Sequence, residues 1–281
     1  MPIVLENVSH TYMPGSAMAQ VALSDISLRV EEGELLGVIG HTGSGKSTLI
    51  QHMNGLMQPS SGRVLVDGLD LCDRKQRMQA RSRVGLVFQY PEYQLFEETV
   101  YKDVAFGPHN LGVPEPEIRE RVEEALQLVG LAPDIFAEKS PFDLSGGEKR
   151  RAALAGILAM RPRYLLLDEP MAGLDPRGRQ SVIDLLQNLR SRTGCAILMV
   201  SHSMDDVSKN ADRIAVLRNG SLVMVDTPAH VFANPEQLVE MGLDIPQAAR
   251  LAVELRKRGI DAPAGIHREE DIERYLLEVL A

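Results

Sequence analysis

The central motif of this chain is Gly40-His41-Thr42-Gly43-Ser44-Gly45-Lys46-Ser47-Thr48. It reads G-x-x-x-x-G-K-S-T, a phosphate-binding loop in which consecutive backbone N–H groups surround a polyphosphate. We expect Lys46 to reach the outer phosphates and the Ser47 hydroxyl to ligate Mg²⁺. The apolar run 35–39 before the motif predicts a buried strand, and a helix is expected to begin within the motif. This order of strand, loop and helix favours an α/β fold over a chance glycine-rich turn.

The composition limits the classes of protein to which this chain can belong. Its 281 residues can bury a sizeable core, and we expect one large domain with an appendage. The net charge of −9 argues against a nucleic-acid-binding surface, because phosphate contacts need clustered Lys and Arg. No apolar run approaches the roughly 18 residues of a membrane span, so we expect an intracellular chain that does not cross a membrane by itself. Cys72 and Cys195 are expected to be buried and reduced.

Polar side chains follow three further apolar runs, at the points where the predicted strands end. They are Gln89, Asp168, Glu169 and His202. Because ligands bind at the carboxyl ends of strands in open α/β sheets, these side chains are candidates for a nucleotide site. We expect Asp168 to support Mg²⁺ and Glu169 to polarise a water that attacks the γ-phosphate. Two simpler interpretations stay open: Asp-Glu-Pro can mark only a strand end, and a lone histidine is more often structural than catalytic.

The remaining sequence predicts accessory parts around this centre. Alternating stretches within residues 1–30 indicate a β-rich edge, and Asn219-Gly220 predicts a hairpin turn. From about 99 to 160 the apolar spacing becomes helical, which predicts a helical insert within a main domain of residues 1–230. Residues 231–281 predict a helical extension, too short for an independent core, that should pack on the main domain or on a partner chain.

Tyr12 lies in a predicted loop between the first two strands. An exposed aromatic ring ahead of a nucleotide loop could stack on adenine. A tyrosine packed against the edge of the sheet is the alternative interpretation.

Taken together, these motifs resemble the ATP-binding-cassette (ABC) ATPases over roughly the first 230 residues. Two further stretches match the family's signature sequence and aspartate loop, namely Leu144-Ser145-Gly146-Gly147-Glu148 and Ala172-Gly173-Leu174-Asp175. The signature ends in Glu148 where many relatives have Gln. We expect phosphate contact to survive this difference, because the Ser145 hydroxyl and the glycine N–H groups make it. The resemblance implies a P-loop nucleotide-binding domain with a β-rich edge, a helical insert and a small helical C-terminal extension.

Two longer stretches narrow the resemblance to the ATPase subunits of energy-coupling-factor importers, which take up vitamins and transition-metal ions. They are 89–100, Gln-Tyr-Pro-Glu-Tyr-Gln-Leu-Phe-Glu-Glu-Thr-Val, and 103–108, Asp-Val-Ala-Phe-Gly-Pro. The first stretch and His41 are similar to the second of the two ATPases in the vitamin systems. The resemblance implies a peripheral protein at the cytoplasmic face of the cell membrane, paired with a paralogous ATPase with help from the C-terminal extension. The pair would drive a transmembrane coupling protein that carries a substrate-binding membrane subunit.

In that family, each ATP is bound between the phosphate loop of one subunit and the signature of the other. The resemblance therefore assigns Ser145, Gly146, Gly147 and Glu148 to the ATP of the partner subunit. It implies in-line attack by a water that Glu169 orients, with Lys46, Mg²⁺ and His202 stabilising the transferred phosphoryl group. Gln89 would join Ser47 and Asp168 around Mg²⁺ and sense the γ-phosphate.

An acidic and apolar segment follows Gln89. We predict that Glu92, Glu97 and Glu98 help form a groove for basic helices of the coupling protein. A merely solvated loop is the alternative interpretation.

Vitamin import is the leading functional interpretation, and a cobalt or nickel importer ATPase of the same family is the nearest alternative. A soluble cassette ATPase acting on DNA or ribosomes would need a long coiled coil, a second cassette or a basic surface, and the sequence shows none of these. The signature at 144–148 argues against a small-molecule kinase.

Overall fold

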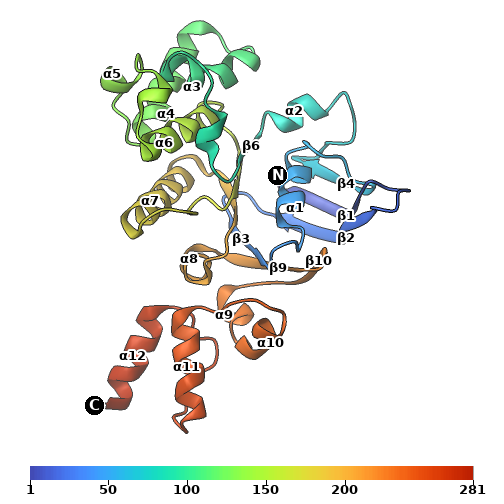
Figure 1. The fold of residues 1–281 in the computed structure, drawn as a ribbon, viewed down its shortest axis with the longest axis vertical. Helices are drawn as coiled ribbons and strands as arrows, with labels where there is room; N and C mark the ends of the chain where they lie inside the picture. The colour runs from blue at the N-terminus through green and yellow to red at the C-terminus, as the bar shows by residue number, and fades with distance from the viewer. Residues whose placement is uncertain (281) are drawn as a thin grey trace.

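A six-stranded sheet forms the centre of the protein in the computed structural model, which describes residues 1–280 (Figure 1). The strand order is β10-β9-β3-β8-β7-β6, and only the β10–β9 pair is antiparallel. The strands are β3 (Leu35–Gly40), β6 (Val84–Val87), β7 (Tyr164–Asp168), β8 (Ala196–Val200), β9 (Arg213–Arg218) and β10 (Ser221–Asp226). Strands β3, β6, β7 and β8 are buried along their length, as their continuous apolar sequences predict for a parallel sheet covered on both faces. The predicted α/β fold is confirmed.

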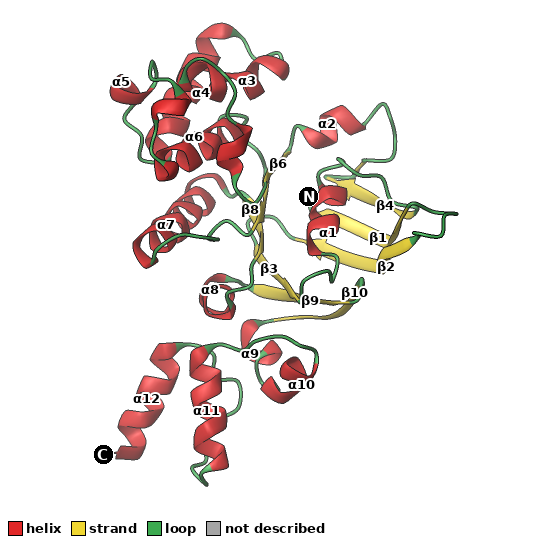
Figure 2. Cartoon of the chain, viewed as in Figure 1, coloured by secondary structure: helices red, strands yellow, loops and turns green. Residues whose placement is uncertain are grey.

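A second, antiparallel sheet forms the predicted β-rich edge. Its order is β2-β1-β4-β5, with strands β1 (Ile3–Tyr12), β2 (Gln20–Val30), β4 (Ser61–Val66) and β5 (Leu69–Asp70). Helix α1 (Lys46–Met53) lies between the two sheets (Figure 2). It buries Leu49, Ile50 and Met53 in a hydrophobic cluster to which both sheets contribute. Strand β1 continues to Tyr12, so this residue ends a strand and does not lie in the predicted loop.

The helical insert lies between β6 and β7, as predicted. Its elements are η1 (Pro91–Gln94), α3 (Val100–Asn110), α4 (Glu115–Leu128), α5 (Pro133–Phe136), η2 (Pro141–Asp143) and α6 (Gly146–Leu158). Helix α4 buries Ile118, Val122, Ala125 and Leu126, which recur at the spacing of one helical face. The short α2 (Arg77–Arg81) precedes β6, and α7 (Pro176–Thr193) and α8 (Met204–Asn210) follow β7 and β8.

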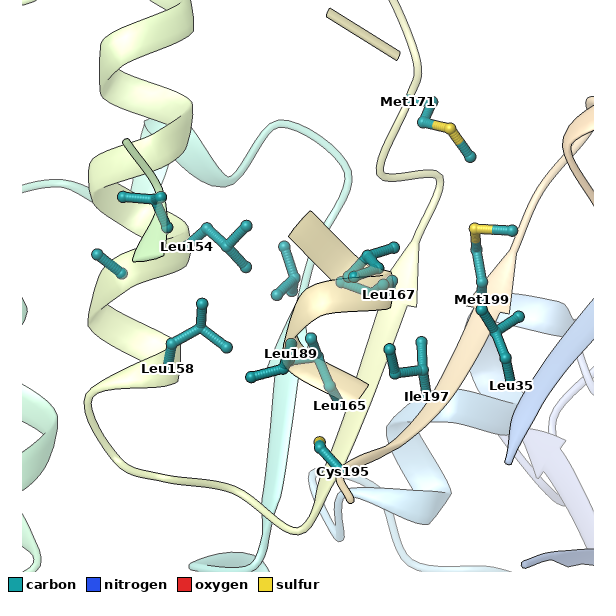
Figure 3. Close-up of a cluster of buried hydrophobic side chains, with 14 of the residues drawn as sticks. Leu35, Leu154, Leu158, Leu165, Leu167, Met171, Leu189, Cys195, Ile197 and Met199 are labelled. Atoms are coloured by element: carbon teal, nitrogen blue, oxygen red, sulfur yellow. The ribbon is translucent and has the colours of Figure 1, made fainter. Parts of the chain in front are cut away.

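A hydrophobic cluster joins the helical insert to the central sheet (Figure 3). Leu165 and Leu167 of β7 lie in this cluster together with Leu154 and Leu158 of α6. Truncating such a buried leucine to alanine costs about 2–5 kcal/mol of unfolding free energy. The cluster therefore fixes α6 relative to the strand that ends in the acidic pair.

The two cysteines differ in their environment. Cys195 is buried in the same cluster, and burial raises the pKa of its thiol to about 12, so this thiol stays protonated at neutral pH. Cys72 is exposed, and the prediction that it would be buried was wrong. It follows Leu71, which turns inward after β5, so only the leucine of this pair is buried.

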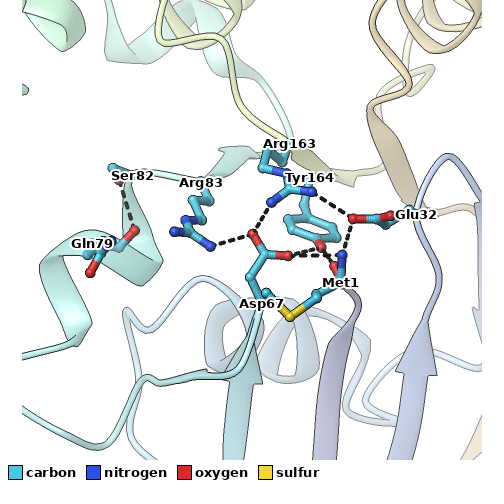
Figure 4. A network of polar contacts seen from close by, with 8 residues as sticks. All are labelled: Met1, Glu32, Asp67, Gln79, Ser82, Arg83, Arg163 and Tyr164. Carbon is cyan, nitrogen blue, oxygen red and sulfur yellow. Dashed lines mark hydrogen bonds and ion pairs between the residues drawn. The ribbon is translucent and has the colours of Figure 1, made fainter.

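A polar network joins the β-rich edge to the start of β7 (Figure 4). Asp67 has a fully buried carboxylate that accepts hydrogen bonds from Arg83 at 2.6 Å, Arg163 at 2.7 Å and the Tyr164 hydroxyl at 2.6 Å. Burial by itself raises the pKa of Asp67, but the bonds from Tyr164 and Arg83 and the charge of Arg163 outweigh it and leave the pKa lowered. The network keeps a buried charge satisfied where the two sheets meet.

The C-terminal extension follows β10. It contains α9 (Pro228–Val231), α10 (Pro235–Glu240), α11 (Gln247–Lys257) and α12 (Glu269–Leu280). Helices α11 and α12 share a small cluster with the segment between them, formed by Ala248, Ala252, Ala262, Ile266 and Ile272. The extension thus has a small core of its own, beyond what its length predicts, while Ile245 and Ala249 join the main core. Within residues 1–280, no helix is both long and apolar enough to span a bilayer.

Candidate nucleotide site

The phosphate loop connects β3 to α1, and two of its glycines are demanded by close packing. Gly45 has φ of +104°, and a Cβ there would lie 2.6 Å from the Ala22 carbonyl oxygen. At Gly40, a Cβ would lie 2.4 Å from the Ser44 Oγ. Because α1 begins at Lys46, the positive end of its dipole faces the same loop. The loop therefore has the backbone geometry of an anion site.

Lys46 is buried within the loop that it serves. Its Nζ donates to the carbonyl oxygens of Gly40 at 2.7 Å and His41 at 3.1 Å. Burial lowers the pKa of Lys46, while the nearby charges of Glu169 and Asp168 raise it. The structure thus brings the lysine and the two predicted carboxylates into one electrostatic environment.

The turn between β9 and β10 braces the phosphate loop, which the sequence did not predict. The Gly220 N–H donates to the Ser44 carbonyl at 3.0 Å, and the His41 Nε2 lies 3.0 Å from the Asn219 Oδ1. The Asn-Gly dipeptide predicts the turn itself, and the hairpin is confirmed. Its contact with residues far away in the sequence depends on β9 pairing with β3.

Asp168 and Ser47 form an oxygen-rich corner beside the loop. Burial raises the pKa of Asp168, while a hydrogen bond with Ser47 and the charges of Lys46 and His202 lower it. A hydroxyl and a carboxylate are the oxygen ligands that Mg²⁺ prefers when phosphate and water complete its shell. Within residues 1–280, no cluster of three or more His, Cys, Asp or Glu side chains forms a metal site by itself. The residues therefore fit a cation shared with a nucleotide.

Gln89 lies at the same edge of the sheet. Strand β6 pairs with β7 so that Val87 is opposite Leu167, which places residue 89 level with the acidic pair. Its side chain is exposed and has no hydrogen bond within the described chain. Its place at the carboxyl edge is as predicted, and its role as a Mg²⁺ ligand stays a prediction.

Glu169 and His202 form a direct pair at the ends of β7 and β8. The His202 Nε2 lies 2.7 Å from the Glu169 Oε1. Glu169 adopts φ of +54°, a left-handed conformation that is uncommon for a residue with a side chain. Burial raises the pKa of Glu169, and the charges of His202 and Lys46 lower it. The geometry suits a carboxylate that accepts a proton from a bound water.

The signature sequence begins a helix in the helical insert. Ser145 caps α6, and its hydroxyl and N–H donate to the Glu148 Oε2 at 2.6 and 2.8 Å in a complete capping box. The helix therefore begins at Gly146, within the signature sequence. Gln can replace Glu in a capping box, so the Glu148 difference from other signatures leaves the local fold intact.

The signature glycines differ from the loop glycines. A Cβ on Gly146 would meet nothing within 4 Å, and on Gly147 it would meet only the end of the Arg151 side chain at 3.8 Å. The packing of this chain therefore does not require glycine at either position. The start of α6 also lies well away from α1, across the central sheet (Figure 1).

Two other predicted residues serve the local structure. Asp175 caps α7, and its Oδ1 accepts a hydrogen bond from the Gly178 N–H at 2.8 Å. The Tyr12 hydroxyl lies 3.0 Å from the Thr48 Oγ1, and its ring packs edge-on against His10 with centroids 4.7 Å apart. Tyr12 is thus placed beside the first turn of α1, with 38% of its surface exposed. Its stacking on adenine stays a prediction.

The three acids of the predicted groove have different surroundings. Glu98 is exposed and forms an ion pair with Lys102 at 2.5 Å, and Glu97 is half-buried. Glu92 is also half-buried, and its Oε2 has no hydrogen bond among residues 1–280. Only Glu98 of these three acids is fully exposed, and their role in a partner groove stays a prediction.

Exposed aromatic rings accompany these acids, and the sequence did not single them out. Phe96 and Phe106 are 56% and 45% exposed and pack edge-to-face with centroids 4.9 Å apart. Tyr90 and Tyr93 form a second exposed pair. Helical periodicity could have revealed Phe106, which lies outside the buried positions Val100, Val104 and Ala105 of α3.

Comparisons with known proteins identify the family of this chain. Residues 23–172 match the family model described as ABC transporter. The energy-coupling factor transporter ATP-binding protein EcfA2 of Caldanaerobacter subterraneus subsp. tengcongensis is 50% identical over 281 residues, covering 100% of this chain and 98% of the relative. The protein of the same name from Symbiobacterium thermophilum is 54% identical over 282 residues, covering 100% and 97%.

Solved structures show the same architecture. One is cbiO1 from Clostridium perfringens, part of the ABC transporter complex cbiONQ, which is 38% identical with a TM-score of 0.74 and covers 89% of this chain and 97% of its own. Another is the cassette MJ0796 in a dimeric post-hydrolysis state bound to ADP and Pi, which is 29% identical with a TM-score of 0.71 and covers 80% and 98%. This chain is therefore an ATPase that belongs to the energy-coupling factor transporter ATP-binding proteins of the ABC transporter family.

Proposed function

We propose that this chain is one of two paralogous ATPases that power a vitamin importer from the cytoplasmic face of the membrane. The observation that supports this proposal is that the phosphate loop and the signature sequence lie apart in this chain. The phosphate loop and the Glu169–His202 pair surround one position, while the signature glycines lie in the helical insert without a packing role of their own. A second ATPase would supply the missing half to each site. The dimeric MJ0796 cassette bound to ADP and Pi supports this arrangement.

In the proposed reaction, the γ-phosphoryl group of ATP is transferred to water. Glu169 orients the water and accepts its proton, and His202 holds the carboxylate from 2.7 Å. Lys46 and the loop N–H groups hold the phosphates and stabilise charge on the transferred group. Ser47, Asp168 and Gln89 would hold Mg²⁺, which neutralises charge on the β- and γ-phosphate oxygens when bound.

The membrane partner is proposed to bind the acids and aromatic rings beside η1. Exposed Phe96 and Phe106 offer apolar contact area, and Glu97 and Glu98 offer charge for a basic helix. The C-terminal extension is proposed to help hold the two ATPases together. Leu251 of α11 and Leu277 of α12 are exposed apolar residues on this extension.

Replacing the proposed base tests the mechanism. Glu169→Gln in the assembled complex should lower the ATP turnover number by about 10²–10⁴-fold, because an amide cannot accept the proton. Equilibrium binding of ATP should stay close to that of the unmodified protein. Near-normal turnover by the variant would reject the assigned role.

Charge reversal tests the partner surface. The double substitution of Glu97→Lys and Glu98→Lys should reduce recovery of the membrane subunits with this chain from solubilised membranes. Reversal of the exposed Glu240, on α10 of the extension, is the matched control. Unchanged recovery would reject the surface, and the identity of the substrate-binding subunit recovered would distinguish a vitamin importer from a cobalt or nickel importer.

A further inference from the structure

Arg150 of α6 reaches from the helical insert to the loop that carries Glu169. Its Nη1 donates to the Ala172 carbonyl at 2.9 Å, and its Nη2 donates to the Pro170 carbonyl at 2.6 Å. A longer contact of 3.5 Å joins the Nη2 to the carbonyl of Glu169 itself. The Ala172 N–H also donates to the Glu169 carbonyl at 3.1 Å, so these carbonyls belong to one tight turn. One guanidinium thus binds the turn from outside.

The contact depends on the shape of the arginine side chain. Arg150 is half-buried and has no carboxylate within ion-pair distance among residues 1–280. Carbonyl dipoles are its direct partners, and a planar guanidinium can donate to several carbonyls at once. Burial lowers the pKa of Arg150, and the charges of Glu92 and Tyr90 raise it. A lysine could donate to these carbonyls from only one nitrogen.

The turn that Arg150 holds contains an unfavourable backbone conformation. Glu169 has φ of +54°, and such a conformation at a residue with a side chain persists only where its surroundings enforce it. On one side, the Glu169 N–H donates to the Val200 carbonyl at 3.1 Å. On the other side, the carbonyls of the same turn accept from Arg150. The two contacts together hold the carboxylate beside His202.

Arg150 also lies beside two other functional segments. It is on the helix that begins with the signature sequence at Ser145. Its helix α6 packs against η1, and η1 carries Glu92, whose Oε2 is buried without a hydrogen bond among residues 1–280. Arg150 therefore connects the helix that begins with the signature sequence to the Glu169 turn.

We propose that Arg150 is a positioning residue that keeps Glu169 in its hydrolytic geometry and makes that geometry depend on α6 and η1. This inference rests on the proposed function, because it assumes that Glu169 orients the attacking water. ATP of the partner subunit at the signature and the membrane protein at η1 would both act on the Glu169 turn through the Arg150 contact.

Arg150→Ala and Arg150→Lys test the proposal in the assembled complex. Arg150→Ala should lower kcat for ATP by about 100-fold, a typical contribution of a positioned base, with KM within about twofold of the unmodified protein. Arg150→Lys should recover part of the activity, because one donor remains. Arg119→Ala is the matched control, since Arg119 lies exposed on α4 of the same insert and should leave kcat unchanged.

Two results would overturn the proposal. One is a kcat of Arg150→Ala within twofold of the unmodified protein. The other is an equal loss of ATP affinity and thermal stability in both Arg150 variants, which would indicate a purely structural contact. Glu169→Gln measured in parallel distinguishes a failure of the Arg150 inference from a failure of the proposed reaction. If Glu169→Gln is inactive while Arg150→Ala is normal, only the Arg150 inference fails. If Glu169→Gln turns over normally, the assigned reaction fails as well.

Discussion

The two glycine motifs of this chain look alike in sequence and differ in structure. In the phosphate loop, Gly40 and Gly45 are enclosed by neighbouring atoms of the same chain, and Gly45 also needs a left-handed backbone. In the signature, Gly146 and Gly147 begin a helix in open space. Glycine in the loop is thus a condition for folding around a phosphate. The packing of this chain does not require glycine in the signature, which is compatible with the proposed binding of the partner's nucleotide there.

Gly45→Ala should give the largest effect on stability. The added Cβ would lie 2.6 Å from a backbone oxygen and would require φ of +104°, so we expect a loss of about 2–4 kcal/mol of unfolding free energy. Urea unfolding followed by circular dichroism measures this loss, and ATP affinity should fall with it. A variant as stable as the unmodified protein would remove the contrast between the two motifs.

Gly146→Ala should leave the stability of the chain intact and lower the ATP turnover of the two-subunit complex. Alanine favours a helix over glycine by up to about 1 kcal/mol, so stability should stay equal or rise. ATP binding by the isolated chain should be unchanged, whereas turnover of the two-subunit complex should fall by about tenfold, because the Cβ occupies space meant for the partner's nucleotide. Normal ATP turnover of the complex would contradict the proposed contact between Gly146 and the partner's nucleotide.

Substitutions of Glu148 should have the smallest effect on folding stability. Glu148→Ala removes half of the capping box and should lower the free energy of unfolding, whereas Glu148→Gln, which can still form the box, should lower it less. Hydrogen bonds from the Ser145 side chain and backbone lower the pKa of Glu148. The ionised Glu148 therefore stabilises the fold at every pH above the ordinary pKa of a glutamate, and this stabilisation is lost as the pH falls through the lowered pKa. Unfolding curves of the unmodified protein and both variants at neutral and acid pH measure this effect. If Glu148→Ala were still less stable than the unmodified protein in acid, the prediction would be contradicted.

The sequence predicted the parts of the site that depend on local pattern. The loop, the carboxyl ends of β6, β7 and β8, and the hairpin were predicted because apolar runs and turn residues fix them over a few positions. The Asn219 contact with His41 and the Arg150 contact with the Glu169 turn were not predicted. Both join polar groups that are separated in sequence, and the strand order and the packing of α6 bring them together. The exposure of Cys72 was missed because an apolar neighbour, Leu71, takes the buried position at that turn.

The brace between the β9–β10 turn and the phosphate loop has a consequence for how this protein is made. Gly220 donates to the Ser44 carbonyl of the loop, and β3 lies between β8 and β9, which come much later in the chain. A ribosome synthesises the chain from its N-terminus, so the motif at residue 40 emerges long before its neighbours exist. The growing chain therefore cannot form a finished phosphate loop until β9 and its turn have left the ribosome. Nucleotide binding is a property that arises late in synthesis, although its motif is among the first to be translated.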